Sequence, residues 1–420
     1  MTTKRTLSIH RPEDILGYIP HLLGYWPDDS LVAITVQGKI LGATLRVDLP
    51  SGHSPRALAG FAEQIRHYLV ADEAANGVML AVYTDAGWAD GTVLQQTMPL
   101  IEALQLSLDE VDLSVRDAWL IGTQYWRSAF CSDHGCCPDP GLPVARIKDS
   151  QLSAELVYQG SVVGPSPRSV TGQPSFARSG PLDPSVMEAE SRFGERILGM
   201  WRSERCLESV LAVWHHVLAT FEHGAALQPA TDAQLIGFLR TTLKVPAWRD
   251  AVVVMAAAGM DSAKSGAAAF GLFSDDDESC APPFDVGELG VPASAAAPPT
   301  IAPSGSRGPG DVFTYGDVLL GMRPDTPCWS LVDALHHVLA GLCVEDEPGE
   351  VAAAAFTLQG WISWCKGSGS MAHACLVRAE AARPGYRLAE LLMKVLRQGA
   401  VCRWASRPDS AWRGSRQAHV

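Results

Sequence analysis

The chain has 420 residues, which is too long for one ordinary hydrophobic core of at most about 250–300 residues. Apolar residues make up 47 % and charged residues 19 %, a composition that excludes wholesale disorder, collagen and coiled coil. The 46 acidic and 33 basic residues give a net charge of −13, which argues against a protein that mainly coats nucleic acid or anionic membrane. We therefore expect a folded protein of two or three domains.

Short β-branched runs alternate with helical patterns from residue 1 to about 160, which is typical of a layered α/β domain. Gly38 supplies the positive φ that a tight turn needs, and it predicts a hairpin between two early strands. Pro20 predicts a kink or an end in the first helix. The expected elements, in order, are helix Arg11–Leu23, strands Ser30–Val36 and Ile40–Leu49, helix Pro55–Ala71, strand Val78–Thr84, helix Thr92–Leu106 and strand Leu113–Ile121.

The second half of the chain is predicted to be helical, with two irregular segments. Residues 161–186 are rich in Gly, Pro and Ser and predict a linker. Residues 274–311 begin with four acidic residues and continue Pro- and Ala-rich, so we predict that this segment is disordered. Residues 187–273 and 312–405 form the helical regions, and residues 406–420 form a mildly basic tail. Helices are expected over Glu188–Phe221, Thr231–Leu243 and Trp248–Met260.

One C-terminal pattern resembles a tetratricopeptide repeat, in which small residues let two antiparallel helices approach closely. Two positions depart from that pattern, since Gln359 replaces the usual leucine and Ser363 the usual aromatic residue. One copy is present, so an ordinary αα-hairpin with tight Ala and Gly packing is the alternative. The positions that carry the pattern are Phe356, Gly360, Gly367, Ala372, Leu376, Ala379 and Pro384.

The stretch YWRSAFCSDHGCCPDPG is the strongest candidate for a functional site. Cys131, His134, Cys136 and Cys137 offer zinc the thiolate and imidazole ligands that it prefers. A second interpretation is a reactive thiol, activated by His134 and resolved by a neighbouring cysteine. A third is a structural loop pinned by prolines, with its cysteines buried under Trp126. The residues alone leave all three interpretations open.

A second candidate site lies at the strand ends of the predicted sheet. Ligands of α/β sheets usually bind at the carboxyl ends of strands, where Asp48, Thr84 and Asp85 are expected. Together with Trp126 they define a predicted ligand cleft. The alternative is that these carboxylates serve turns and helix caps. No Walker loop, GxGxxG, GxSxG, HExxH or deaminase motif is present, so we assign no catalytic residue.

Several blocks of the chain resemble the successive signature blocks of the actinobacterial "domain of unknown function 4192" family. The early blocks are RPEDILGYIPHLLGYWPDDSLVAI, LGATLRVDLP, LAVYTD and YWRSAFCSDHGCCPDPGLPV, and the late ones LIGFLRTTLKVPAWRDAVVVMA and FTLQGWISWCKGSGSMAHACLVRAEAARPGYRLAELL. The resemblance implies an actinobacterial cytoplasmic protein with an α/β front and a helical rear. It also implies that Cys131, Cys136, Cys137 and Pro138 are recurrent features of the family.

From these observations we predict a cytoplasmic, non-catalytic interaction or regulatory module, since a repeat-like hairpin and an acidic linker occur without a catalytic fingerprint. The expected partner is another protein or a second copy of the chain, not nucleic acid or membrane. No apolar run reaches signal-peptide quality or the roughly 20 residues that cross a bilayer. The alternative is an enzyme or metal-binding protein with a site at the Cys131–Cys137 loop beside the strand ends. Zinc is the cofactor that this alternative implies.

Overall fold

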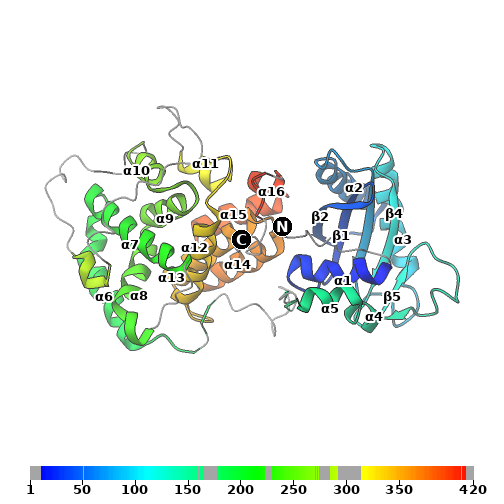
Figure 1. The fold of residues 1–420 in the computed structure, drawn as a ribbon, viewed down its shortest axis with the longest axis horizontal. Coiled ribbons are helices and arrows are strands. Elements are labelled where there is room, and N and C mark those ends of the chain that lie inside the picture. Colours follow the sequence, from blue (N-terminus) through cyan, green and yellow to red (C-terminus); the bar gives the residue numbers. More distant parts are fainter. Residues whose placement is uncertain are drawn as a thin grey trace, which may run out of the picture. The chain divides into compact units, whose positions relative to one another are not determined.

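The computed structural model divides the chain into two compact units, residues 1–174 and 175–420 (Figure 1). The boundary falls within residues 161–186, the segment that we predicted as a linker. A mixed α/β unit comes first and a helical unit second, so the predicted fold class is confirmed. The structure describes residues 11–50, 52–158, 161, 163–164, 177–178, 180–222, 229–269, 271, 273, 284–291, 314–407 and 409–412.

The described part of the first unit contains a six-stranded mixed sheet with the order β2-β1-β3-β4-β5-β6. Only β3 and β4 run parallel, and the other neighbours pair antiparallel. Gly38 has φ +65° in the β1–β2 turn, as predicted. The short strands β5 and β6 were not predicted. The strands are β1 Ser30–Gln37, β2 Ile40–Asp48, β3 Gly77–Tyr83, β4 Val115–Ile121, β5 Tyr125–Ser128 and β6 Leu142–Pro143.

Helices cover both faces of this sheet, which explains why β1 reads as a continuous apolar run. Leu31 and Ala33 pack into the core that α2 and α3 share, whereas Val32 and Ile34 pack with α1 and α4 on the opposite face. Pro20 lies inside α1 and does not end it. The helices are α1 Pro12–Leu23, α2 Pro55–Leu69, α3 Val93–Asp109, α4 Ala145–Lys148 and α5 Gln151–Tyr158.

The helix predicted over Glu188–Phe221 is in fact two helices, α6 and α7, and the single-helix prediction is wrong. Ser203 causes the break, because its side chain accepts a hydrogen bond from the Cys206 N–H at 3.3 Å and thereby caps α7. The second unit comprises α6 Pro184–Ile197, η1 Leu198–Met200, α7 Glu204–Glu222, α8 Pro229–Leu243, α9 Pro246–Ala258, α10 Met260–Ala269, η3 Val286–Leu289, α11 Tyr315–Leu319, α12 Trp329–Leu342, α13 Glu350–Cys365, α14 Gly369–Ala382, α15 Arg387–Arg397 and α16 Arg403–Ser406.

Part of the segment predicted to be disordered is ordered, which corrects that prediction for residues 284–291. These residues form the short helix η3 and its flanks. Phe284, Leu289 and Val291 are buried and pack into the core of the second unit. Burial of these three apolar side chains thus stabilises an ordered structure here, although the composition of the segment as a whole predicted disorder. Residues 274–283 and 292–313, like most of the predicted basic tail, lie outside the described residues.

The predicted helical hairpin is formed by α13 and α14. A Cβ atom at Gly360 would lie 3.1 Å from the Leu376 side chain, so the glycine permits the close helix approach that the pattern predicted. Every residue of α13 from 351 to 365 is buried, including Gln359 and Ser363. The departures from the repeat pattern therefore lie among buried residues, and residues 351–365 of α13 offer no surface to a partner.

A buried arginine on α8, Arg240, joins three segments of the second unit. Its Nε lies 2.6 Å from Glu190 of α6, and its Nη2 lies 2.5 Å from Glu347 before α13. Nη1 donates to the carbonyl oxygen of Leu342 at the end of α12. Lys244 approaches the same Glu190 at 2.6 Å. Both carboxylates and the guanidinium are thereby compensated, which a buried charge requires.

We expect Arg240→Met to destabilise the protein by about 3–5 kcal/mol, because it leaves two half-buried carboxylates without their common cation. Urea unfolding followed by circular dichroism measures the change in free energy. Arg383→Met is the matched control, since Arg383 pairs with Glu350 at 2.6 Å but its side chain is 48 % exposed. The control should cost less than about 1 kcal/mol. Equal effects of the two substitutions would contradict the role assigned to Arg240.

Candidate metal site

The cysteine-containing loop connects the last two strands of the sheet, β5 and the edge strand β6. Strand β5 pairs with β4, and β6 returns antiparallel so that Trp126 faces Leu142. Residues 129–141 form the loop between them. Because β5 runs antiparallel to β4, the loop leaves the sheet beside the middle of β4, where Ser128 pairs with Trp119. A rigid strand pair therefore holds both ends of the loop.

A tight turn at Asp133 brings the second half of the loop back toward Cys131. The Asp133 carboxylate accepts a hydrogen bond from the Gly135 N–H at 2.8 Å. Its carbonyl oxygen accepts from the Cys136 N–H at 3.1 Å and from the Cys137 N–H at 2.7 Å. Aspartate two residues before glycine is a typical residue for such a turn. The backbone is thus arranged so that all three cysteines lie on one side of the loop.

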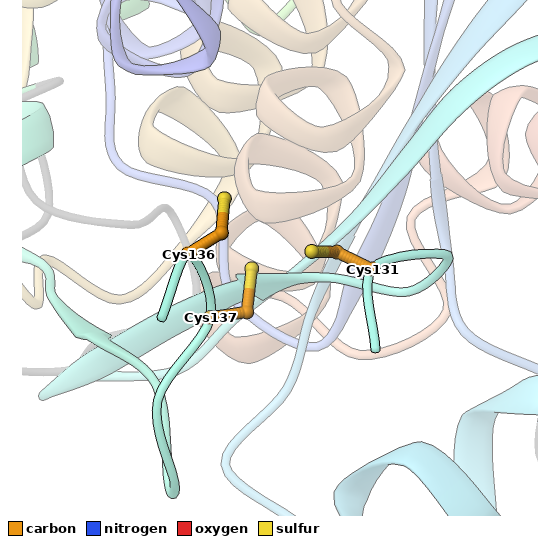
Figure 2. A group of neighbouring side chains, drawn as sticks. All are labelled: Cys131, Cys136 and Cys137. Carbon is orange, nitrogen blue, oxygen red and sulfur yellow. The ribbon is translucent and has the colours of Figure 1, made fainter. Parts of the chain in front are cut away.

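The three sulfur atoms converge. The Sγ atoms of Cys131, Cys136 and Cys137 all lie within 4.8 Å of one another, and Figure 2 shows Cys131 directed toward the other two. All three are free thiols, with Cys137 buried, Cys131 partly buried and Cys136 exposed. Sulfurs bound to one tetrahedral zinc ion lie about 3.8 Å apart, given Zn–S bonds of about 2.3 Å. Shifts of roughly 1 Å would therefore bring the thiolates to zinc-binding distance.

The thiols of Cys131 and Cys136 do not ionise equally. A hydrogen bond with the Asp133 backbone, and further ones from Cys137 and Cys136, lower the pKa of Cys131. The hydrogen bond and the negative charge of Cys131 raise the pKa of Cys136 to about 11. Of these two thiols, Cys131 therefore loses its proton first as the pH rises. A cation bound among the sulfurs would offset the negative charge of Cys131, so that the remaining thiols could also lose their protons.

His134, the predicted fourth ligand, lies on the same turn but outside the group of converging sulfurs. Its side chain is 78 % exposed, and its Nδ1 lies 3.6 Å from Oδ2 of Asp139. Asp139 in turn accepts a hydrogen bond from Arg127 at 3.2 Å. A carboxylate beside Nδ1 leaves Nε2 as the ring nitrogen available for a metal, an arrangement that recurs around zinc-bound histidines. Sequence reasoning missed Asp139 and Arg127, although Asp139 belongs to the same short motif.

The residues of the predicted cleft make local hydrogen bonds, an ion pair and core contacts, and they do not converge on a ligand site. Thr84 accepts a hydrogen bond from the Ala86 N–H at 3.2 Å, and Asp85 accepts one from the Thr123 N–H at 2.7 Å. Asp48 pairs with Arg46 at the end of β2. Trp126 is buried in the core. Thr84 and Asp85 lie just beyond the carboxyl ends of β3 and β4, whereas the cysteine loop leaves β5 beside the middle of β4.

In reduced, metal-free protein we expect iodoacetamide to alkylate Cys131 well before Cys136, because thiolate is the reactive form. The midpoint of the labelling curve should lie below pH 9.0, the ordinary thiol pKa, for Cys131 and near pH 11 for Cys136. Peptide mass spectrometry after brief labelling at several pH values measures both curves. Identical curves for the two cysteines would contradict the proposed hydrogen-bonded cluster.

Comparison with known proteins identifies the family. Among the described residues, no helix has both the length and the apolar character needed to cross a bilayer. A search of curated proteins and a search of solved structures each found no match. A family model described as "Domain of unknown function (DUF4192)" matches residues 12–275 and 330–401, and the matched part includes the cysteine loop. The chain therefore belongs to the DUF4192 family of proteins.

Proposed function

We propose that the first unit binds one zinc ion through the thiolates of Cys131, Cys136 and Cys137. The observation that carries the proposal is the convergence of three free sulfurs within 4.8 Å on a loop held at both ends by strands. Cysteines that serve packing alone would occupy separate apolar environments, whereas Cys136 is exposed beside its neighbours. Three soft donors in this arrangement favour zinc over the hard cations magnesium and calcium.

His134 completes the proposed site as its fourth ligand after a local movement of the loop. The imidazole is exposed, so burial does not oppose its rotation, and Asp139 can orient Nδ1 while Nε2 binds the metal. Three cysteines and one histidine form a closed tetrahedral set with no position for a substrate. The site would then stabilise or regulate the loop, in agreement with the non-catalytic role and the reducing cytoplasm predicted from the sequence. Restriction of the protein to actinobacteria also stays a prediction.

Native mass spectrometry of the intact protein, purified with reductant and without chelator, tests the proposal. We expect one zinc ion per chain in the wild type, loss of the ion in Cys131→Ser and weakened binding in His134→Ala. Cys328→Ser is the matched control, because Cys328 is an exposed thiol of the second unit. This variant should retain the zinc ion.

A bare wild-type chain that also takes up no added zinc or cadmium would refute the metal site. In that event rapid oxidation between Cys131 and a neighbouring cysteine would support the reactive-thiol interpretation instead. Retention of zinc by Cys131→Ser would contradict the ligand assignment but not metal binding itself.

Association with another protein, or with a second copy of the chain, is the second candidate function. Two exposed apolar side chains favour it, Val377 on α14 (48 % exposed) and Leu391 on α15 (43 % exposed). These helices follow α13 in the region that resembles a repeat. A partner of this region would contact α14 and α15, since α13 is buried.

We expect the double substitution Val377→Glu and Leu391→Glu to abolish association, because association would bury two carboxylates that have no compensating positive charge. Sedimentation velocity at physiological salt measures self-association, and a pull-down with the same variants measures other partners. Val157→Glu is the control, since Val157 is 58 % exposed on the first unit. A wild-type protein that is monomeric and captures nothing would refute this function.

A further inference from the structure

The second unit contains a pocket of about 760 Å³ that neither candidate function uses. It forms where η1, the α8–α9 connection, the first turn of α9 and α11 meet. Pockets of about 300–1,000 Å³ with mainly apolar walls are typical of small-molecule sites. The apolar part of the lining comprises Leu198, Trp201, Val245, Pro246, Tyr315 and Leu319.

Hydrogen bonds from buried aromatic side chains fix the α11 wall of this pocket. The Tyr315 hydroxyl donates to the carbonyl oxygen of Ala263 on α10 at 2.6 Å. The Trp361 indole on α13 donates to the carbonyl oxygen of Leu319 at 2.7 Å. Both Tyr315 and Leu319 line the pocket, so the wall is held from two sides. A ligand would enter a preformed site and would not have to order it.

Trp201 gives the pocket an aromatic surface. The side chain is 37 % exposed, which is unusual for the largest apolar residue in a unit whose other tryptophans include fully buried ones such as Trp214 and Trp248. The Arg202 guanidinium lies 4.7 Å from the centre of the Trp201 ring and covers one face. The other face can therefore receive the apolar body of a ligand.

Asp250 supplies a negative polar group in the wall, one turn into α9. Its Oδ1 accepts from Arg249, at 2.8 Å from Nε and 2.7 Å from Nη2. Arg249 is buried and also contacts the Tyr386 hydroxyl, so it is fixed on the far side of the carboxylate. Among the described residues, Oδ2 of Asp250 has no hydrogen-bond donor. Burial raises the pKa of Asp250 although Arg249 opposes the shift, and the ionised carboxylate thus gains from a further donor.

Lys244, the one lysine among the described residues of the lining, does not favour an anionic ligand. The ammonium group of Lys244 lies 2.6 Å from Glu190, which also pairs with Arg240. Its charge is therefore already compensated, while the carboxylate of Asp250 would repel an anion. Charge complementarity in the pocket selects a cation or a neutral donor that can reach Oδ2.

We propose that this pocket binds a small aromatic or aliphatic amine, with its apolar body against Trp201 and Leu319 and its ammonium group hydrogen-bonded to Asp250. The ligand class follows from two requirements of the walls, apolar contact over most of the volume and one donor aimed at a carboxylate. The proposal is independent of the metal site, because every residue that it uses belongs to the second unit.

Three naphthalene probes that differ in one group test the proposal by calorimetry on the full chain. We expect 2-(1-naphthyl)ethylamine to bind more tightly than 2-(1-naphthyl)ethanol, and the corresponding carboxylate, 3-(1-naphthyl)propanoate, to bind most weakly. Asp250→Asn should weaken the amine at least about tenfold, since a hydrogen bond to a charged group is lost, and should leave the alcohol almost unchanged. Asp261→Asn, which removes the same charge from an exposed residue of α10, should change neither affinity.

A substitution that fills the pocket provides a second test that leaves Asp250 intact. Gly316 lines the pocket, and an added Cβ would meet only the Thr314 hydroxyl, at 3.7 Å. Gly316→Leu should therefore abolish binding of all three probes while the circular dichroism spectrum stays that of the wild type. The proposal is overturned if the amine binds no better than the carboxylate, or if its affinity survives both Asp250→Asn and Gly316→Leu.

Discussion

Burial of residues 351–365 of α13 is the constraint on which the helical unit depends. After Glu350 in its first turn this helix carries no charged side chain, and its neighbours approach closely where its side chains are small, as at Gly360. The polar groups of its side chains must then form hydrogen bonds within the unit. The indole of Trp361 donates to Leu319, and that of Trp364 donates to Ala400 at 2.8 Å. Through the first of these bonds, the packing of the central helix also determines the shape of the amine pocket.

The two candidate sites obtain their rigidity in different ways. The pocket is rigid because whole helices are packed around it, and Arg240 fixes α8 just before the connection that forms one wall. The cysteine loop has no such enclosure, and it depends on the Asp133 turn and on the strand pair at its ends. A loop of this kind gains most from an added cross-link, because few other contacts restrict it. A metal ion at the three sulfurs would provide one, whereas the pocket needs none.

The sequence was most informative where structure is local. Alternating β-branched runs predicted β1 to β4, and the spacing of Cys131, Cys136 and Cys137 predicted that their sulfurs could meet. The break at Ser203 was missed because the apolar residues before it continue a helical pattern, so that only the cap distinguishes the two helices. The pocket could not be predicted, since residues 198 and 319 meet only after the helices pack. Asp250 likewise reads as an ordinary helix residue until its surroundings are known.

Charge explains why the metal site is better suited to holding structure than to catalysis. Three thiolates around a divalent zinc ion give the cluster a net charge of about −1, and this charge weakens the attraction that acidifies a bound water. Asp133 and Asp139 add negative charge on the same loop, and Arg127 is the nearby cation that pairs with one of them. A neutral histidine as fourth ligand would close the remaining position without adding charge. The same residues that would make zinc binding favourable at the proposed site would therefore make hydrolysis there unfavourable.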